Sequence, residues 1–200
     1  MGLKLSSAIT IARGILADTS PDYRYPDPDL LEYGNGALRA LITLKPSLFY
    51  TEADVTCATG KALQTAGFAD IDSLVKVQSV KDGNIITLID KSVLDNFSPG
   101  WMQMTAGVAQ HWMPHADDPF KFYLYPPAPS GQQVTVLYVR VPATYTADQD
   151  TGLPESLKDA VTDYIVGMAE SRDDEHVNSA RSSQFISQFS ARLGVAPAKG

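Results

Sequence analysis

The apolar residues near the N-terminus recur every three or four positions, which is the spacing of an amphipathic helix. Ser6 and Ser7 are the candidate caps of this first helix. We expect the chain to leave the helix at Asp18–Pro21, because a proline disfavours helical geometry in the residue before it. The apolar stripe consists of Leu5, Ala8, Ile9, Ala12, Ile15 and Leu16.

A second helix has a clearer start, with Asp27 as the predicted N-cap and Pro28 at the first helical position. Lys45-Pro46 should end it. Gly34 and Gly36 lie inside this helix, and each costs it up to ~1 kcal/mol relative to alanine. We therefore expect another backbone to approach closely at these two positions. The apolar face consists of Leu30, Leu31, Ala37, Leu38, Leu41 and Ile42.

Helical spacing returns in the last quarter of the chain. Leu153-Pro154-Glu155 should open a third helix, and Gly194 is a suitable residue to end a fourth. Ser171–Asp174 marks a break between them, although one long kinked helix is the alternative. The predicted inner stripes are Leu157, Val161, Tyr164, Ile165 and Met168 in the third helix, and Val177, Phe185, Ile186, Phe189 and Leu193 in the fourth.

Between these helical regions, apolar residues tend to alternate with polar ones, which is the period of β-strands. Lys81–Asn84 has the residues of a tight turn, so Asn84–Ile89 is predicted to return as the second strand of a hairpin. Residues 56–72 have no clear pattern and are predicted to form a loop. The other predicted strands are Leu48–Val55, the segment around Val75 and Val77, Val108–Met113, Phe120–Tyr125 and Gln132–Val141.

A short helix is predicted to interrupt the β-region. Asp90 is its expected N-cap, and Ser98-Pro99-Gly100 closes it after Phe97. Trp101 follows directly, and we expect its large apolar ring to anchor this segment by packing.

The predicted fold class is α+β. Two N-terminal and two C-terminal helices should form a terminal α-helical bundle from residues 1–46 and 147–200, because their apolar stripes must be buried against one another. Residues 47–146 are expected to be an inserted β-rich region, either a small β-sandwich or a curled antiparallel sheet.

Composition narrows the class of protein. The chain has 44% hydrophobic and 20% charged residues, which is typical of a globular protein. The net charge of −7 comes without a basic stripe, so a conventional role in reading DNA or RNA is not expected. Cys57 is the single cysteine, which fits a reducing compartment. No apolar run approaches the ~20 residues that span a bilayer, and polar residues interrupt any signal peptide at the N-terminus.

The histidines are the candidates for a metal site. His111 and His115 are four residues apart with Asp117 and Asp118 close by, and His176 follows further along the chain. On a helix that spacing would place two imidazoles on one face, as in zinc enzymes. Trp112-Met113-Pro114 instead indicates a strand, and the glutamate of the zinc-enzyme motif is absent. A metal-dependent hydrolase that uses these two histidines remains an alternative, and histidines at the surface or in an interface are favoured.

Two further groups of residues allow more than one interpretation. Phe122, Tyr123, Tyr125 and Tyr138 could line the pocket of a small-ligand binding module, but a sheet core with an interface face is the commoner use of such residues. Cys57 is interpreted as a buried small apolar residue, since no histidine can be placed beside it to activate the thiol. No catalytic residues, cofactor or metal are predicted.

Four stretches carry a resemblance to a known family. They are Tyr23–Pro46, Ile89–Trp101, Asp117–Pro142 and Leu153–Phe189, of which the third is the most similar. Together they cover about half of the chain and follow the family's order. On these stretches the chain resembles the head-to-tail adaptor (connector) proteins of tailed bacteriophages.

The resemblance implies a structural virion protein and not an enzyme. It implies a homo-oligomeric ring, typically of twelve subunits, that docks on the portal protein, extends the DNA channel and carries a downstream tail or nozzle protein. DNA would pass through the lumen without sequence-specific binding, and no membrane is involved. The expected location is the neck or tail of the virion, after assembly in the host cytoplasm. Candidate portal contacts lie in the C-terminal tail: Val195, Ala196, Pro197, Lys199 and Gly200.

Overall fold

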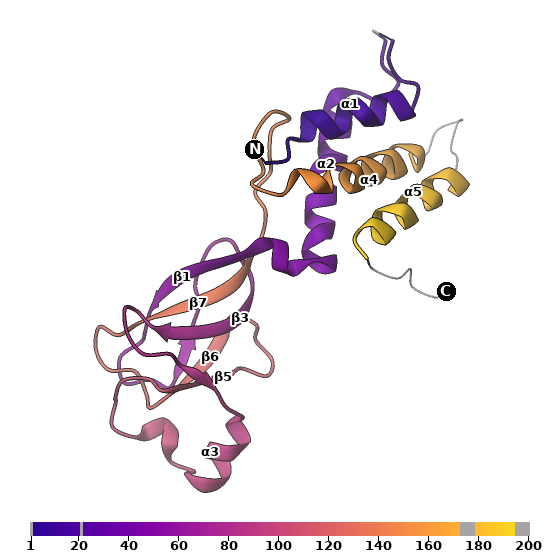
Figure 1. Ribbon diagram of the computed structural model, residues 1–200. Helices are drawn as coiled ribbons and strands as arrows, with labels where there is room; N and C mark the ends of the chain where they lie inside the picture. The colour runs from indigo at the N-terminus through magenta and orange to yellow at the C-terminus, as the bar shows by residue number, and fades with distance from the viewer. Residues whose placement is uncertain (1, 21, 173–178, 195–200) are drawn as a thin grey trace. The chain divides into compact units, whose positions relative to one another are not determined.

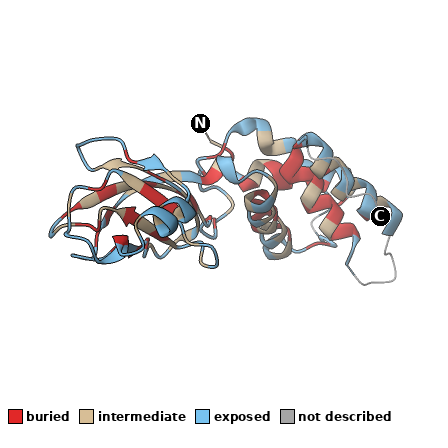
Figure 2. Cartoon of the chain, turned by 90° about the horizontal axis from the view of Figure 1, so that it is seen from below, coloured by how far each residue is buried: buried red, intermediate tan, exposed pale blue. Residues whose placement is uncertain are grey.

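The computed structural model describes residues 2–20, 22–172 and 179–194 of the chain (Figure 1). The fold is α+β, as predicted. It divides into two compact units, a helical unit formed by Met1–Leu48 with Pro142–Gly200, and a β unit formed by Phe49–Val141. Buried residues are found inside both units (Figure 2).

The helical unit contains the four predicted helices within the described residues. They are α1 (Leu5–Ile15), α2 (Asp27–Leu44), α4 (Lys158–Glu170) and α5 (Ser179–Arg192), and a short 3-10 helix, η3 (Glu155–Leu157), precedes α4. Helices α1, α2 and α5 each contact α4. None of these described helices is long and apolar enough to cross a membrane. The fully buried side chains of this unit include Leu3, Leu5, Leu30, Leu38, Leu41 and Ile165.

Backbone bonds tie the N-terminal segment to a distant part of the same unit. The N–H of Leu3 donates to the carbonyl of Leu153 at 2.8 Å, and the N–H of Thr151 donates to the carbonyl of Leu3 at 3.0 Å. Asn35, buried in α2, fixes the backbone of Tyr145 by donating to its carbonyl at 3.0 Å and accepting from its N–H at 2.8 Å. Segments more than a hundred residues apart in sequence are thereby joined.

The predicted helix starts were wrong in detail. The N-cap of α1 is Lys4, with no side-chain cap, and Ser7 Oγ instead donates to the Lys4 carbonyl at 2.7 Å. Helix α2 begins at Asp27 itself, with Pro26 as N-cap. Asp27 does not cap the helix backbone because its carboxylate binds Arg13.

The end of α1 also differs from the prediction. The helix stops at Ile15, before the predicted stop at Asp18–Pro21, because Ala17 takes a left-handed backbone conformation with φ of 53°. The prediction that Lys45-Pro46 ends α2 is confirmed, since Lys45 is the C-cap.

Side chains, and not another backbone, approach the two glycines of α2. A Cβ atom on Gly34 would lie 3.3 Å from Cδ2 of Leu5 and 3.6 Å from Cδ1 of Ile165, while one on Gly36 would lie 3.4 Å from the ring of Tyr164. The expected backbone contact was therefore wrong. Small residues are needed because apolar side chains from α1 and α4 fill the space beside α2.

The β unit consists of two small sheets. In the first, the order is β1 (Tyr50–Thr56), β7 (Gln133–Arg140), β3 (Ile71–Val80), all antiparallel. In the second, the order is β2 (Leu63–Thr65), β6 (Lys121–Tyr125), β5 (His111–Pro114), β4 (Thr87–Leu88), and β4 is parallel to β5. A short 3-10 helix, η1 (Pro46–Phe49), precedes β1. Both sheets contribute to one core, which includes Val55, Val77, Phe122, Leu124, Val136 and Tyr138.

Two predictions in this region are confirmed only in part. The tight turn at Lys81–Asn84 is present, with the N–H of Gly83 donating to the carbonyl of Val80 at 3.0 Å. The returning segment, however, pairs with β3 through one bridge only, Ser79 with Ile85, before β4 joins the second sheet. Residues 56–72 also include β2 and the start of β3, so they are not simply a loop.

The short helix in the β-region is confirmed as α3 (Lys91–Phe97). Asp90 caps it by accepting the N–H of Ser92 at 2.9 Å. Trp101 begins the 3-10 helix η2 (Trp101–Gln103), is fully buried, and donates its Nε1–H to Asp95 of α3 at 3.0 Å. The tryptophan therefore anchors a helix that has no buried residue of its own.

Candidate interaction surfaces

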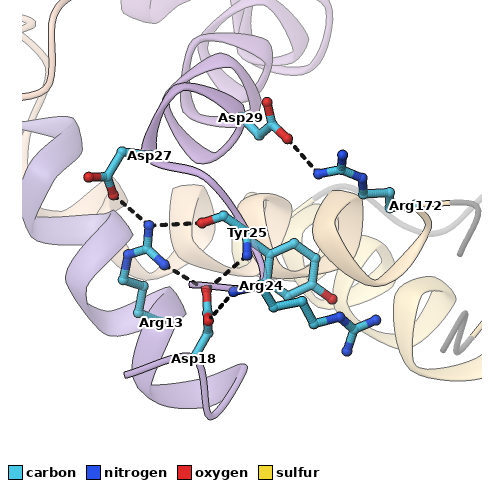
Figure 3. Close-up of polar contacts among 7 residues, drawn as sticks. All are labelled: Arg13, Asp18, Arg24, Tyr25, Asp27, Asp29 and Arg172. Atoms are coloured by element: carbon cyan, nitrogen blue, oxygen red, sulfur yellow. Dashed lines mark hydrogen bonds and ion pairs between the residues drawn. The ribbon is translucent and has the colours of Figure 1, made fainter. Parts of the chain in front are cut away.

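A buried arginine organises the connection between α1 and α2 (Figure 3). Arg13 of α1 donates to the carboxylate of Asp18 at 2.6 Å, to the carbonyl of Tyr25 at 3.0 Å and to the carboxylate of Asp27. Asp18 is also buried, and it accepts the backbone N–H groups of Arg24 at 2.8 Å and of Tyr25 at 3.2 Å. We call this group of residues the Arg13 clamp.

The clamp satisfies groups that could not be buried alone. An unpaired charge in a protein interior is strongly destabilising, so Arg13 and Asp18 need one another. The ring of Tyr23 also covers the guanidinium of Arg13, 3.7 Å from its centroid. The sequence analysis did not identify this group. The available signal was an arginine beside the apolar stripe of the first helix, followed by aspartates in the next connection.

A hollow of about 640 Å³ lies beside the clamp. Its wall is mainly apolar, and its charged groups are Arg13 and Asp27, whose carboxylate side chain is 74% exposed. The lining residues from α1 and α2 include Ile9, Arg13, Asp27, Pro28 and Leu31.

Helix α5 is held on α4 by ion pairs and by apolar contacts, including Phe189 of α5 against Tyr164 of α4. Arg192 of α5 donates to Asp163 of α4 at 2.5 Å, and Arg181 pairs with Glu170 at 3.0 Å. Burial raises the pKa of the Asp163 carboxyl, while the bond to Arg192 opposes that shift. The backbones come close at Gly167, where a Cβ atom would lie 3.3 Å from the backbone nitrogen of Ile186.

An open groove of about 750 Å³ lies in the β unit. Strands β3 and β4 are the last strands of their sheets, and residues of both line the groove. We call it the edge groove. Lys76, Asp118 and Lys121 contribute charge, and Lys121 pairs with Asp118 at 2.7 Å. The apolar part of the wall is formed by Leu74, Ile85, Leu88, Trp112, Pro114 and Pro119.

A second set of exposed apolar residues in the β unit lies on α3 and on the segment that follows it. We call it the α3 tip and define it by Val93, Phe97, Met102 and Met104, all of which are exposed. Phe97 is 86% exposed, more than any other large apolar side chain in the described part of the chain. Methionine and phenylalanine side chains in such a setting are typical of surfaces that bind other proteins.

The histidines proposed as metal ligands each have their own aromatic neighbour. His111 stacks on Tyr125 with its Nδ1 2.6 Å from Thr87 Oγ1, and His115 stacks on Tyr123. Within residues 2–20, 22–172 and 179–194, no group of three or more histidine, cysteine, aspartate or glutamate side chains could hold a metal ion. His176 lies outside the described residues.

The four aromatic residues considered for a ligand pocket lie in two different clusters. Phe122 and Tyr138 are buried in the core shared by the two sheets, whereas Tyr123 and Tyr125 pack against Trp101 on the other side of β6. Successive side chains of a strand point to opposite faces of the sheet, so Phe122 lies on one face of β6 and Tyr123 and Tyr125 lie on the other. Cys57 is buried, as expected, and burial raises the pKa of its thiol to about 11.

The candidate portal contacts Val195, Ala196, Pro197, Lys199 and Gly200 lie outside the described residues. The sequence analysis singled out neither the edge groove nor the α3 tip. The apolar residues of the tip are visible in the sequence, but the sequence does not show which of them is buried. In the structure Trp101 is the only buried residue of the segment from 90 to 104, and the tip residues are exposed.

Comparison with known proteins gives a family match. The model of the family described as SU10 adaptor protein matches residues 4–199. No match was found among the curated proteins.

Proposed function

Because the chain belongs to the SU10 adaptor protein family, whose members are phage head-to-tail adaptors, we propose that it forms a ring that docks on the portal and carries the next tail component. The adaptor role is structural, and its place is the neck of the virion. The family match, which spans almost the whole chain, is the observation that carries the proposal.

In this proposal the four helices are the bundle on which the ring is built. Three contacts support it, since α1, α2 and α5 all pack on α4. The Arg13 clamp supports it as well, because it fixes the connection between α1 and α2 and so keeps the surface of the bundle constant from subunit to subunit. A repeated interface requires such a constant surface.

The ring extends the DNA channel and lets DNA pass without sequence-specific binding. The net charge of −7 supports this, because an acidic protein repels the phosphate backbone and does not grip it. Twelve subunits are proposed, in keeping with the ring expected from the resemblance. Assembly is proposed to occur in the host cytoplasm.

The C-terminal tail, Val195–Gly200, is the proposed portal contact. Deleting these six residues should abolish co-sedimentation with portal rings and leave the thermal unfolding of the chain unchanged. A variant with a glycine–serine tail of the same length is the control for length. Co-sedimentation that is equal in the wild type and the deletion variant would contradict the tail's role, whereas a wild type that does not bind portal rings would contradict the proposed function.

A further inference from the structure

We propose that the α3 tip of one copy inserts into the edge groove of a neighbouring copy. The inference rests on the proposed function, because it names the surfaces that join subunits in the ring. The occupant of the groove is thus a second copy of this chain, and the residue that enters the groove is Phe97. Both surfaces belong to the β unit.

The groove exposes apolar surface that a closed pair of sheets would cover. Strand β3 is the last strand of the first sheet, and β4 is the last strand of the second. In the described chain, the segments that contain these strands are paired at one isolated bridge, between Ser79 and Ile85. Ile85 is 77% exposed and Leu88 is 62% exposed as a result. Single apolar residues are common on surfaces, but a lined apolar groove of about 750 Å³ has room for an aromatic side chain.

The α3 tip is held rigidly before any partner arrives. Asp90 caps the helix, Lys91 pairs with Asp95 at 2.7 Å, and Trp101 fixes Asp95 from the buried side. Phe97 is nevertheless 86% exposed, so it does not occupy the edge groove of its own chain. A rigid, exposed aromatic residue loses little conformational entropy on binding, which makes it a suitable anchor for an interface.

The charges of the two surfaces are complementary. With histidine counted as neutral, Lys76 and Lys121 against Asp118 leave the edge groove with one net positive charge. In the described chain no carboxylate lies within ion-pair distance of Lys76. Asp90 and Asp95 against Lys91 leave helix α3 and its cap with one net negative charge. A groove with net positive charge, in a chain of net charge −7, favours the net negative helix α3 of another copy.

The symmetry of the contact agrees with a ring. A tip-to-groove contact joins two different surfaces, so it is heterologous, and repeated at each subunit it either closes into a ring or continues as a filament. In a closed ring every tip and every groove is occupied. One contact therefore accounts for both exposed apolar surfaces of the β unit.

Cross-linking tests the contact directly. Ser79 lines the groove and Asn96 is adjacent to Phe97, so Ser79→Cys and Asn96→Cys place one thiol on each surface. The native Cys57 gives little background, because it is buried and its pKa is about 11. We expect a short bis-maleimide to link the two variants when they are mixed with portal rings. Neither variant alone should give a linked product.

Three results would overturn the inference. A product from Asn96→Cys alone would mean that tips meet tips. The absence of a mixed product, when the same mixture has bound portal rings, would mean that tip and groove do not meet. If the wild type does not bind portal rings, the proposed function fails. The contact between tip and groove is then tested by cross-linking the same mixture at rising concentration without portal. The absence of a mixed product in that experiment would also reject the contact.

Substitution of the anchor gives an independent measure. Phe97→Asp should raise the concentration for half-assembly by roughly tenfold or more, while Val108→Asp, at a residue 56% exposed outside both surfaces, should not. Equal melting temperatures would show that both variants are folded. If Phe97→Asp still forms rings on the portal but loses the downstream tail protein, the tip binds that protein and the inference is wrong.

Discussion

The helical unit and the β unit differ in how many large apolar side chains they leave exposed to solvent. The helical unit encloses Leu5, Leu30, Leu38 and Ile165 completely, and it pairs its buried arginine with a buried aspartate. The β unit has a core between its sheets, yet its helix α3 has no buried residue. Among the described residues, most of the exposed large apolar side chains lie in the β unit, including Ile85, Leu88, Val93, Phe97, Met104 and Val108.

This difference separates two roles. A unit that leaves few large apolar side chains exposed and pairs its buried charge internally is suited to serve as a scaffold. A unit that keeps a rigid apolar tip and an open apolar groove is suited to binding other subunits. The predictions below measure how far the two units differ.

The largest effect is expected at the anchor of α3. Trp101→Ala should destabilise the β unit by about 3–5 kcal/mol, since it removes a fully buried indole and its bond to Asp95. Phe97→Ala is the matched control on the same segment, and its cost should stay below about 0.5 kcal/mol. Chemical denaturation measures both. Similar costs for the two substitutions would mean that α3 is not held by Trp101.

The Arg13 clamp should give the next largest effect. Arg13→Met leaves the buried carboxylate of Asp18 without its cation, and we expect a loss of about 3 kcal/mol in the free energy of unfolding. Arg39→Met is the control, because it breaks an exposed pair with Glu32 worth less than about 1 kcal/mol. Adding Asp18→Asn to Arg13→Met should recover part of the loss. Equal losses for Arg13→Met and Arg39→Met would show that the clamp does not stabilise the helical unit.

A smaller effect is expected where α5 meets α4. A methyl group on Gly167 would lie 2.8 Å from Cδ1 of Ile186, so Gly167→Ala should cost about 1–3 kcal/mol and loosen α5. Gly14→Ala in α1 meets no atom within 4 Å and should instead stabilise by up to about 1 kcal/mol. Thermal unfolding distinguishes the two. Gly167→Ala at or above wild-type stability would mean that the helices are not tightly packed there.

The smallest effect is expected when a thiol reagent is added to the native protein, because Cys57 is buried. Labelling of Cys57 tests whether the core of the β unit is closed around this residue. Burial raises the pKa of its thiol to about 11, so roughly one thiol in a thousand is ionised at pH 8. The thiolate is the reactive form, and labelling should therefore rise with pH towards 11. A thiol reagent should leave the native protein unlabelled at pH 8 and label it fully in denaturant. Rapid labelling of the native chain would show that this core opens.

The helices were predictable because each has its own local signal. The apolar stripes of α1, α2 and α4 and the cap at Asp90 identified their elements from sequence alone. Boundaries were less certain. Asp27 has the chemistry of an N-cap, but its carboxylate binds Arg13, a partner fourteen residues away that no local pattern reveals.

The second sheet and the interaction surfaces could not be predicted in the same way. Strand β4 has two residues and β2 has three, too few for any period to be visible. The parallel pairing of β4 with β5 is a long-range contact, whereas the turn signal at Lys81–Asn84 predicted only the antiparallel bridge of Ser79 with Ile85. The edge groove depends on where these short strands end, so it became visible only with the fold.

Electron microscopy of the full chain mixed with its portal rings tests the central claim most directly. We predict a second ring of density stacked coaxially on the portal, with the DNA channel continuing through it. Portal rings that remain bare, while the chain stays dispersed in solution at saturating concentration, would contradict the assignment of this protein as the adaptor ring.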